Sequence, residues 1–156
     1  LTNRNPVIAG IRFDGEPMDD SALCIGEACV TAEEPTCESL PQVELCDPNE
    51  PTGCKEYEIA PIVEESDNSE LDYVASTIGG KQARLKEQMW IRYYADQGEI
   101  ARDAKRLQDA SEGWFAEHTT KWTVPEKGEG IAHLWTVVHD NRGGVDWARL
   151  SICLGS

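Results

Sequence analysis

The fold is predicted most directly by one stretch near the C-terminal end, Ile131-Ala-His-Leu-Trp-Thr-Val-Val-His-Asp-Asn-Arg-Gly-Gly-Val-Asp-Trp-Ala-Arg-Leu-Ser-Ile-Cys-Leu154. Apolar or small residues alternate with period two on both sides of a glycine turn at 140–144. The residues that share one face are Ala132, Leu134, Thr136 and Val138 before the turn, and Ala148, Leu150, Ile152 and Leu154 after it. The stretch therefore predicts a β-hairpin with one face buried.

Length and composition are typical of one globular domain, because the chain has 156 residues and 40% of them are hydrophobic. No apolar run approaches the roughly 20 residues that cross a bilayer, and no basic-then-apolar start is present. Either a secretion signal has been removed or none existed, and a lipid anchor before Leu1 stays open.

The six cysteines favour the interpretation that a secretion signal has been removed. They are Cys24, Cys29, Cys37, Cys46, Cys54 and Cys153. No Cys-x-x-Cys pair occurs and no histidine lies among the first five, so the pattern predicts disulfides over a zinc site or free thiols. Because disulfides persist in oxidising compartments, we expect a secreted, cell-surface or periplasmic protein. The sequence leaves fifteen connectivities open.

The net charge of −15 is unevenly distributed. Between Asp14 and Asp72 there are eighteen acidic residues and one basic residue, Lys55. Such a surface repels nucleic acid and anionic lipid, so we expect neither as a partner, and a membrane only through an upstream anchor. It could attract cations or a basic partner, or it could simply be solvated charge on an exposed insertion.

Further strands are predicted where aromatic and β-branched residues cluster or alternate between turn residues. They cover residues 5–13, 56–64, 88–98 and 119–124, and the strand at 88–98 is expected to be central. Residues 99–112 contain good helix formers and predict a short helix. Residues 66–80 are polar and predict an irregular segment, whereas four prolines between 35 and 51 argue against a continuous helix or a central strand there.

The order of four segments along the chain resembles that in the immunoglobulin-like (PKD-like) sandwich domains of bacterial secreted proteins and lipoproteins. They are Asn-Arg-Asn-Pro-Val-Ile at 3–8, Trp-Ile-Arg-Tyr-Tyr-Ala-Asp-Gln-Gly at 90–98, Lys-Trp-Thr-Val-Pro at 121–125 and Trp-Thr-Val-Val-His-Asp-Asn-Arg-Gly-Gly at 135–144. The resemblance implies an all-β class and a single immunoglobulin-like β-sandwich over residues 1–156. A disulfide-rich acidic insertion, residues 14–54, departs from that pattern.

The resemblance also implies how distant segments meet. In such sandwiches the first and last strands run side by side in parallel, so Cys153 would return to the insertion and all six thiols would gather at one pole. The strand of Trp90 would likewise lie beside the strand of Trp135. We therefore expect Cys153 to pair with a cysteine of residues 24–54.

Strand parity predicts a binding face on the outside of the hairpin. If Leu134 and Val138 face the core, Trp135 and Val137 face outward. A turn centred on 141–143 places Val137 across from Trp147, and Trp135 across from Arg149. The predicted face comprises Trp90, Arg92, Tyr94, Trp135, Val137, Trp147 and Arg149. Such a surface usually contacts a partner, although the insertion or the predicted helix could cover it instead.

The indications of metal binding in this sequence are weaker than those of a binding face. The loop at 64–72 offers oxygen ligands and makes calcium a candidate cofactor, through Asp67, Asn68, Glu70 and Asp72. His133 and His139 lie about 20 Å apart along a strand and cannot share a metal, and each histidine is expected to be an exposed strand or loop residue.

No catalytic residues are predicted, because no nucleophile elbow or phosphate-binding loop is present. We therefore expect a non-enzymatic binding or structural module that contacts another protein or assembles with its own copies. A carbohydrate-binding or hydrolase-accessory domain is the alternative.

Overall fold

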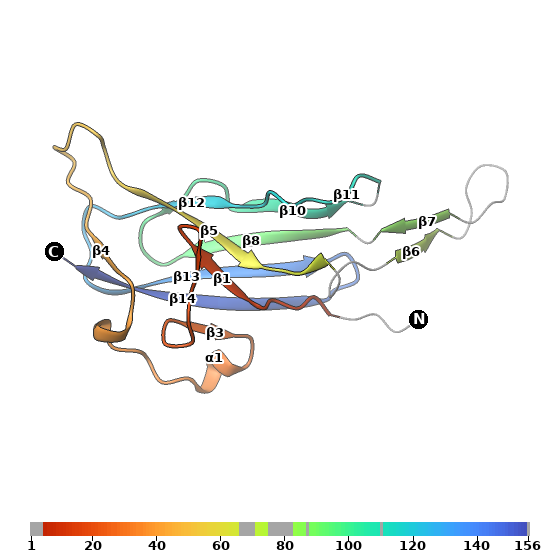
Figure 1. Ribbon diagram of the computed structural model, residues 1–156, viewed down its shortest axis with the longest axis horizontal. Coiled ribbons are helices and arrows are strands. Elements are labelled where there is room, and N and C mark those ends of the chain that lie inside the picture. The colour runs from red at the N-terminus through yellow and green to blue at the C-terminus, as the bar shows by residue number, and fades with distance from the viewer. Residues whose placement is uncertain (1–4, 66–70, 75–82, 87, 110, 156) are drawn as a thin grey trace.

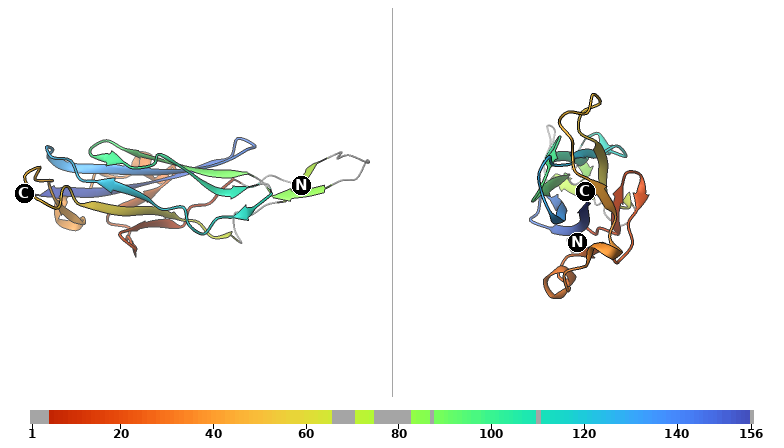
Figure 2. Two further views of the ribbon diagram at one scale, coloured as in Figure 1. Left: turned by 90° about the horizontal axis from the view of Figure 1, so that it is seen from above. Right: turned by 90° about the vertical axis from the view of Figure 1, so that its left-hand side faces the viewer.

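The computed structural model describes residues 5–65, 71–74, 83–86, 88–109 and 111–155 (Figure 1). The described chain is almost entirely β-structure, arranged as two layers that face each other (Figure 2). The predicted all-β sandwich is thereby confirmed.

The C-terminal hairpin forms the middle of the larger layer. Its strands β13 (Gly130–Asp140) and β14 (Val145–Gly155) pair antiparallel from end to end. Leu134, Val138, Leu150 and Ile152 are fully buried, as the alternation predicts. The turn is closed by the Asp140 carboxylate, which accepts hydrogen bonds from the backbone N–H groups of Arg142 and Gly144. The predicted hairpin and its buried face are confirmed.

The larger layer is a seven-stranded sheet with the order β11-β10-β8-β13-β14-β3, and β4 also pairs with β14. Its other strands are β3 (Leu23–Ile25), β4 (Gln42–Glu44), β8 (Met89–Ala95), β10 (Ala104–Asp109) and β11 (Gly113–Trp114). The expectation that 88–98 holds a central strand is confirmed, because β8 lies between β10 and β13.

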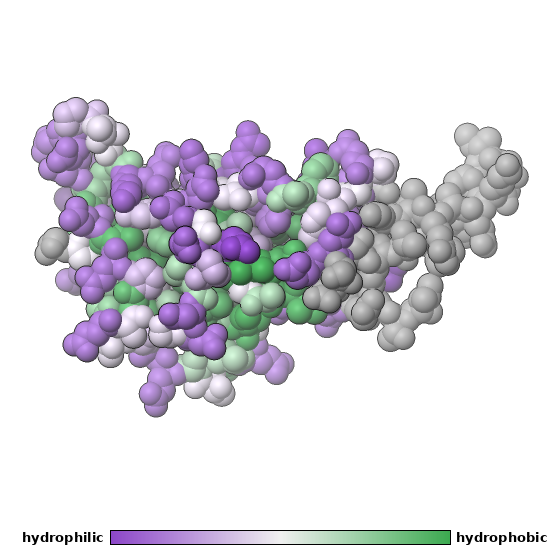
Figure 3. All heavy atoms as spheres, viewed as in Figure 1, coloured by the Kyte–Doolittle hydropathy of each residue, from purple (hydrophilic) through white to green (hydrophobic). Residues whose placement is uncertain are grey.

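The smaller layer is a five-stranded sheet with the order β2-β1-β5-β12-β9. Its strands are β1 (Gly10–Phe13), β2 (Glu16–Pro17), β5 (Glu56–Ile62), β9 (Glu99–Ile100) and β12 (Thr120–Thr123). The predicted strands at 5–13, 56–64 and 119–124 correspond to β1, β5 and β12. In Figure 3, the side of the molecule that carries β1 and β5 shows hydrophobic residues surrounded by hydrophilic ones.

Two predictions about local structure are wrong. The described part of 99–112 contains β9 and β10 instead of the predicted helix, because β9 pairs with β12 and β10 pairs with β8, both outside this segment. Within 66–80, residues 71–74 form β6 (Leu71–Val74), which pairs with β7 (Ala83–Lys86) beyond the end of the sandwich opposite the C-terminus (Figure 1).

The core lies between the two sheets and contains aromatic side chains from both. Trp122 of β12 is fully buried, and its indole Nε1 donates a hydrogen bond to the Gln97 carbonyl oxygen (2.8 Å). Gly98 lies against this indole with φ 80°, where a Cβ atom would overlap the Thr123 carbonyl oxygen. Tyr93 of β8 is 1% exposed, and its hydroxyl donates to the His118 carbonyl oxygen (2.6 Å). Burial, followed by the charge of Glu117, raises the pKa of the Tyr93 phenol well above its usual range.

Three disulfides hold the insertion. They join Cys24 to Cys29, Cys37 to Cys153 and Cys46 to Cys54, so every cysteine is paired and Cys153 bonds to the insertion as predicted. The insertion also contains α1 (Ala28–Thr31) and the 3-10 turn η1 (Cys37–Ser39). Its strands β3 and β4 pair with β14 at the edge of the seven-stranded sheet, with α1 beside β3, whereas β2 pairs with β1 of the smaller sheet (Figure 2).

The route by which Cys153 reaches the insertion differs from the expected one. β1 and β14 belong to different sheets, and the parallel partner of β14 is β4 of the insertion itself. Cys153 lies opposite Gln42 of β4, whereas Cys24 lies opposite Arg149, four residues earlier on β14. The six thiols therefore do not gather at one pole, because the insertion follows the β14 edge along part of its length.

Candidate binding face

The outward side of the seven-stranded sheet carries all seven residues of the predicted face. On β13, Trp135 lies opposite Tyr94 of β8 and Arg149 of β14. One step along, Val137 lies opposite Arg92 and Trp147. Because side chains alternate along a strand and Leu134 and Val138 point into the core, these residues project away from it. The register across the hairpin and the place of β8 beside β13 are as predicted.

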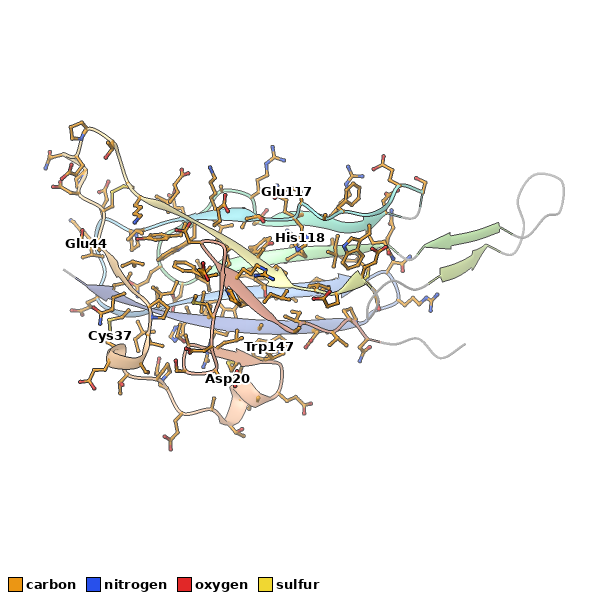
Figure 4. The ribbon with its side chains drawn as sticks, viewed as in Figure 1. Asp20, Cys37, Glu44, Glu117, His118 and Trp147 are labelled. Carbon is orange, nitrogen blue, oxygen red and sulfur yellow. A yellow bond between two sulfur atoms is a disulfide. The ribbon has the colours of Figure 1, made fainter. Side chains whose placement is uncertain are left out.

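The insertion covers one end of this side of the sheet. Ser151 and Cys153 occupy outward positions of β14, yet they are only 2% and 6% exposed. The insertion bonds to the same stretch, since the N–H groups of Ser151 and Cys153 donate to the carbonyl oxygens of Ala22 and Pro41 (2.8 Å each). Figure 4 shows Cys37 near the C-terminal end of β14 and Trp147 next to β3. The alternative that the chain covers its own face is thus realised at this end.

His133, in the middle of the sheet, contacts a glutamate of the insertion. His133 of β13 places Nδ1 2.9 Å from Asp96 Oδ2 and Nε2 3.2 Å from Glu34 Oε1. Because β14 separates β13 from β3 and β4, Glu34 reaches His133 only if the chain around it passes over the outward side of β14. The expectation of an exposed histidine is wrong here, since the His133 side chain is 16% exposed.

Arg149 lies beneath this crossing. It lines a small cavity of about 60 Å³ together with Glu33 and Pro35 of the insertion. Its Nε atom is buried, without a hydrogen-bond partner in the described part of the chain. Arg149 belongs to the predicted binding face, but the insertion leaves it only partly exposed. We call His133, Arg149, Ser151 and Cys153 the covered part of the face.

The opposite end of the face is accessible. Tyr94 is 51% exposed, and the side chains of Arg92 and Arg106 are 45% and 68% exposed. The Trp90 indole stacks on the His139 ring, with centroids 5.3 Å apart and planes 11° apart. We call Trp90, Arg92, Tyr94 and Arg106 the open part of the face. Trp135, Val137 and Trp147 lie between the two parts and are half-buried.

A shallow hollow of about 250 Å³ lies at the edge of the open part. It is lined by Trp90, Arg92, Ala104, Lys105 and Arg106. Across β10 and β8, Arg106 pairs with Trp90 and Ala104 pairs with Arg92, so the register brings these side chains together. Sequence reasoning missed Lys105 and Arg106 because Ala-Lys-Arg-Leu-Gln at 104–108 contains good helix formers, and only pairing with β8 makes the segment a strand.

The hollow is positively charged, whereas the insertion is negative. Arg92 has Asp103 at 3.8 Å and Arg106 has Asp109 at 3.8 Å, both loose ion pairs, so the cations that face the hollow are the two guanidinium groups. Residues 14–54 contain eleven acidic residues and no basic residue. The hydrophilic loop between Cys46 and Cys54 projects at the upper left of Figure 3. The two charge signs are therefore separated in space, with the cations near the open part of the face.

The other two histidines are only partly exposed, and the calcium prediction concerns residues whose side chains are not described. His118 is half-buried, with its ring nitrogens near the carbonyl oxygens of Phe115 (3.2 Å) and Pro61 (3.4 Å), and His139 is half-buried against Trp90, so neither is the exposed residue expected. The calcium prediction falls on Asp67, Asn68 and Glu70, which lie outside the described residues, and on Asp72 of β6, whose side chain is not described. Within the described ranges, no group of three or more His, Cys, Asp or Glu side chains is placed to hold a metal ion.

Comparison of the chain with protein-family models, with curated proteins and with solved structures found no match. Among the residues that the structure describes, no helix is long and apolar enough to span a membrane.

Proposed function

We propose that this chain is a non-enzymatic binding module of a secreted, cell-surface or periplasmic bacterial protein, related to immunoglobulin-like (PKD-like) domains. It contacts a protein partner through the open part of the face. One observation carries the proposal: β8 and β10 present Trp90, Arg92, Tyr94 and Arg106 side by side, while the insertion leaves this end of the sheet accessible. Aromatic and arginine side chains dominate the binding energy of protein interfaces.

The shape of the face favours a protein over a sugar chain. Trp135 and Trp147 project from a pleated sheet, and the hollow beside Trp90 is shallow. Sugar-binding tryptophans would be expected to line a groove that follows the chain of the sugar. A carbohydrate-binding or hydrolase-accessory role therefore remains the second candidate, supported by the position of Trp90 in the hollow.

The three disulfides support a location outside the cytoplasm. Disulfides persist in oxidising compartments, and the insertion has few other means of holding its shape, because its helix and strands have two to four residues each.

Partner capture followed by titration tests the proposal. The wild-type chain is cross-linked to its neighbours in an envelope extract of the cells that make it, and the captured protein is purified. Binding is then measured by calorimetry for wild type, Arg92→Glu and Tyr94→Ser. Arg12→Glu is the matched control, because it makes the same charge change at an exposed position of β1 in the other sheet.

We expect Arg92→Glu and Tyr94→Ser each to raise the Kd about tenfold or more, with Arg12→Glu unchanged. Equal binding by all four chains would overturn the proposed face. Titration with soluble polysaccharides provides the second arm: binding that Tyr94→Ser abolishes, with no protein captured, would replace the protein-binding function by the carbohydrate-binding one.

A further inference from the structure

The cationic hollow and the acidic insertion lie at opposite edges of one sheet. The hollow is formed on β10 and β8, and β11 extends this edge only beside Gln108 and Asp109. The part of the insertion that contains β3 and α1 lies at the other edge, where β3 pairs with β14. Four strand spacings separate β10 from β3, about 19 Å. Because α1 follows β3 outside that edge, its side chains cannot reach the hollow of the same molecule.

The tip of the insertion presents an apolar side chain between carboxylates. Val30 of α1 is 77% exposed. Glu27 precedes the helix and Glu33 follows it, and both are exposed. A short aliphatic group flanked by two acidic side chains complements a hollow that offers an indole flanked by two guanidinium groups.

We propose that the partner of the open part of the face is a second copy of this chain, which docks the α1 tip of its insertion into the hollow. The inference rests on the proposed function, because it uses the same face and names the occupant. Val30 packs against Trp90, while Glu27 and Glu33 approach Arg92 and Arg106. The other charged residues near the hollow are Asp103 and Asp109, each 3.8 Å from one of the two arginines, and Lys105, whose pairing with the buried Ile91 places its side chain on the other side of the sheet.

The position of the two surfaces determines the kind of assembly. The tip and the hollow are different surfaces, so a pair joined by one contact leaves one tip and one hollow unused. Repetition of that contact gives an open chain or a closed ring. A reciprocal two-fold dimer, in which each copy places its tip in the hollow of the other, uses both surfaces and is the smallest closed form.

Sedimentation velocity over a range of concentrations tests the assembly. We expect the average mass of the wild-type chain to rise with concentration in about 0.05 M NaCl and to fall toward the monomer in about 0.5 M NaCl, because salt screens exposed charges. Val30→Ser should weaken the association without changing the net charge. Arg12→Glu with Lys127→Glu, at exposed positions outside the hollow, is the charge-matched control and should still assemble.

Charge exchange between the two surfaces tests the contact itself. Arg92→Glu with Arg106→Glu makes the hollow acidic, and Glu27→Arg with Glu33→Arg makes the tip basic. Each double variant alone should stay monomeric because its tip and hollow then carry like charges. An equimolar mixture should assemble again, since each tip meets a hollow of opposite sign.

The outcomes separate this inference from the function on which it rests. A wild-type chain that stays monomeric under all conditions overturns the self-association, but the face keeps its role if a captured protein still depends on Arg92 and Tyr94. Assembly that ignores the hollow variant, or a mixture that fails to assemble, overturns the tip-to-hollow contact. If neither assembly nor partner binding depends on Arg92, both proposals are wrong.

Discussion

The covered and open parts of the outward face share one strand parity but have different surroundings. Tyr94, Trp135 and Arg149 form a single row across β8, β13 and β14. Tyr94 is 51% exposed, whereas Trp135 and Arg149 are half-buried and the Arg149 Nε atom is buried, because the insertion crosses the β14 side. Parity therefore determines which side of a sheet a residue occupies, whereas a distant segment of the chain decides whether that side is accessible.

The largest loss of stability is expected when the disulfide that holds the insertion against the covered part is removed. Cys37→Ala with Cys153→Ala removes a disulfide that spans 116 residues, and Cys24→Ala with Cys29→Ala removes one that spans 5. Loop-closure entropy predicts losses of about 5 and about 2 kcal/mol in the free energy of unfolding. Urea unfolding of both variants measures the difference, and equal losses would contradict it.

Reduction of the disulfides should show that the insertion is locally less stable than the sandwich. We expect reductant to make the insertion sensitive to protease before the sandwich unfolds, because most residues of the hydrophobic core lie outside the insertion. Limited proteolysis with mass spectrometry locates the first cuts. Initial cuts in β8 or β13 would show that the insertion is required for the sandwich to persist.

Substitutions along the face should become more destabilising from the open part inward. Trp135→Ser with Trp147→Ser removes two half-buried indoles and should cost about 3 kcal/mol of stability in total, with the fold intact. Tyr94→Ser should cost less than about 0.5 kcal/mol, because its side chain is exposed. Urea unfolding with near-ultraviolet circular dichroism tests both. A double variant that fails to fold would show that the intermediate tryptophans belong to the core.

A smaller loss of stability is expected when the contact between His133 and the insertion is removed. The Glu34 side chain is 69% exposed, so its interaction with His133 is largely screened by solvent. A double-mutant cycle with Glu34→Gln and His133→Gln should give a coupling energy below about 1 kcal/mol. Hydrogen exchange should still accelerate at 32–36 in either single variant, and no local change would mean that the disulfides alone hold this crossing.

The smallest effect concerns the turn between β10 and β11, beside the open part. The backbone N–H groups of Glu112 and Ser111, with the Ser111 hydroxyl, donate to the Asp109 carboxylate and lower its pKa to about 2. A depressed folded-state pKa stabilises the fold above the ordinary value of 3.8, and this contribution is lost as the pH falls toward 2. The stability difference between wild type and Asp109→Asn should therefore shrink over that window, as thermal unfolding from pH 6 to pH 2 would measure. A pH-independent difference would contradict this.

The sequence by itself determined the hairpin, its buried face and the register that aligns Trp135 with Arg149, because a two-residue period and a glycine turn are local properties. It also indicated that Cys153 returns to the insertion, although by a different route. Lys105 and Arg106 were hidden by local helix propensity, which pairing with β8 overrides. Only the tertiary structure decided that residues 14–54 cross β14 and divide the face, since the contact of Glu34 with His133 joins positions 99 residues apart that no local pattern relates.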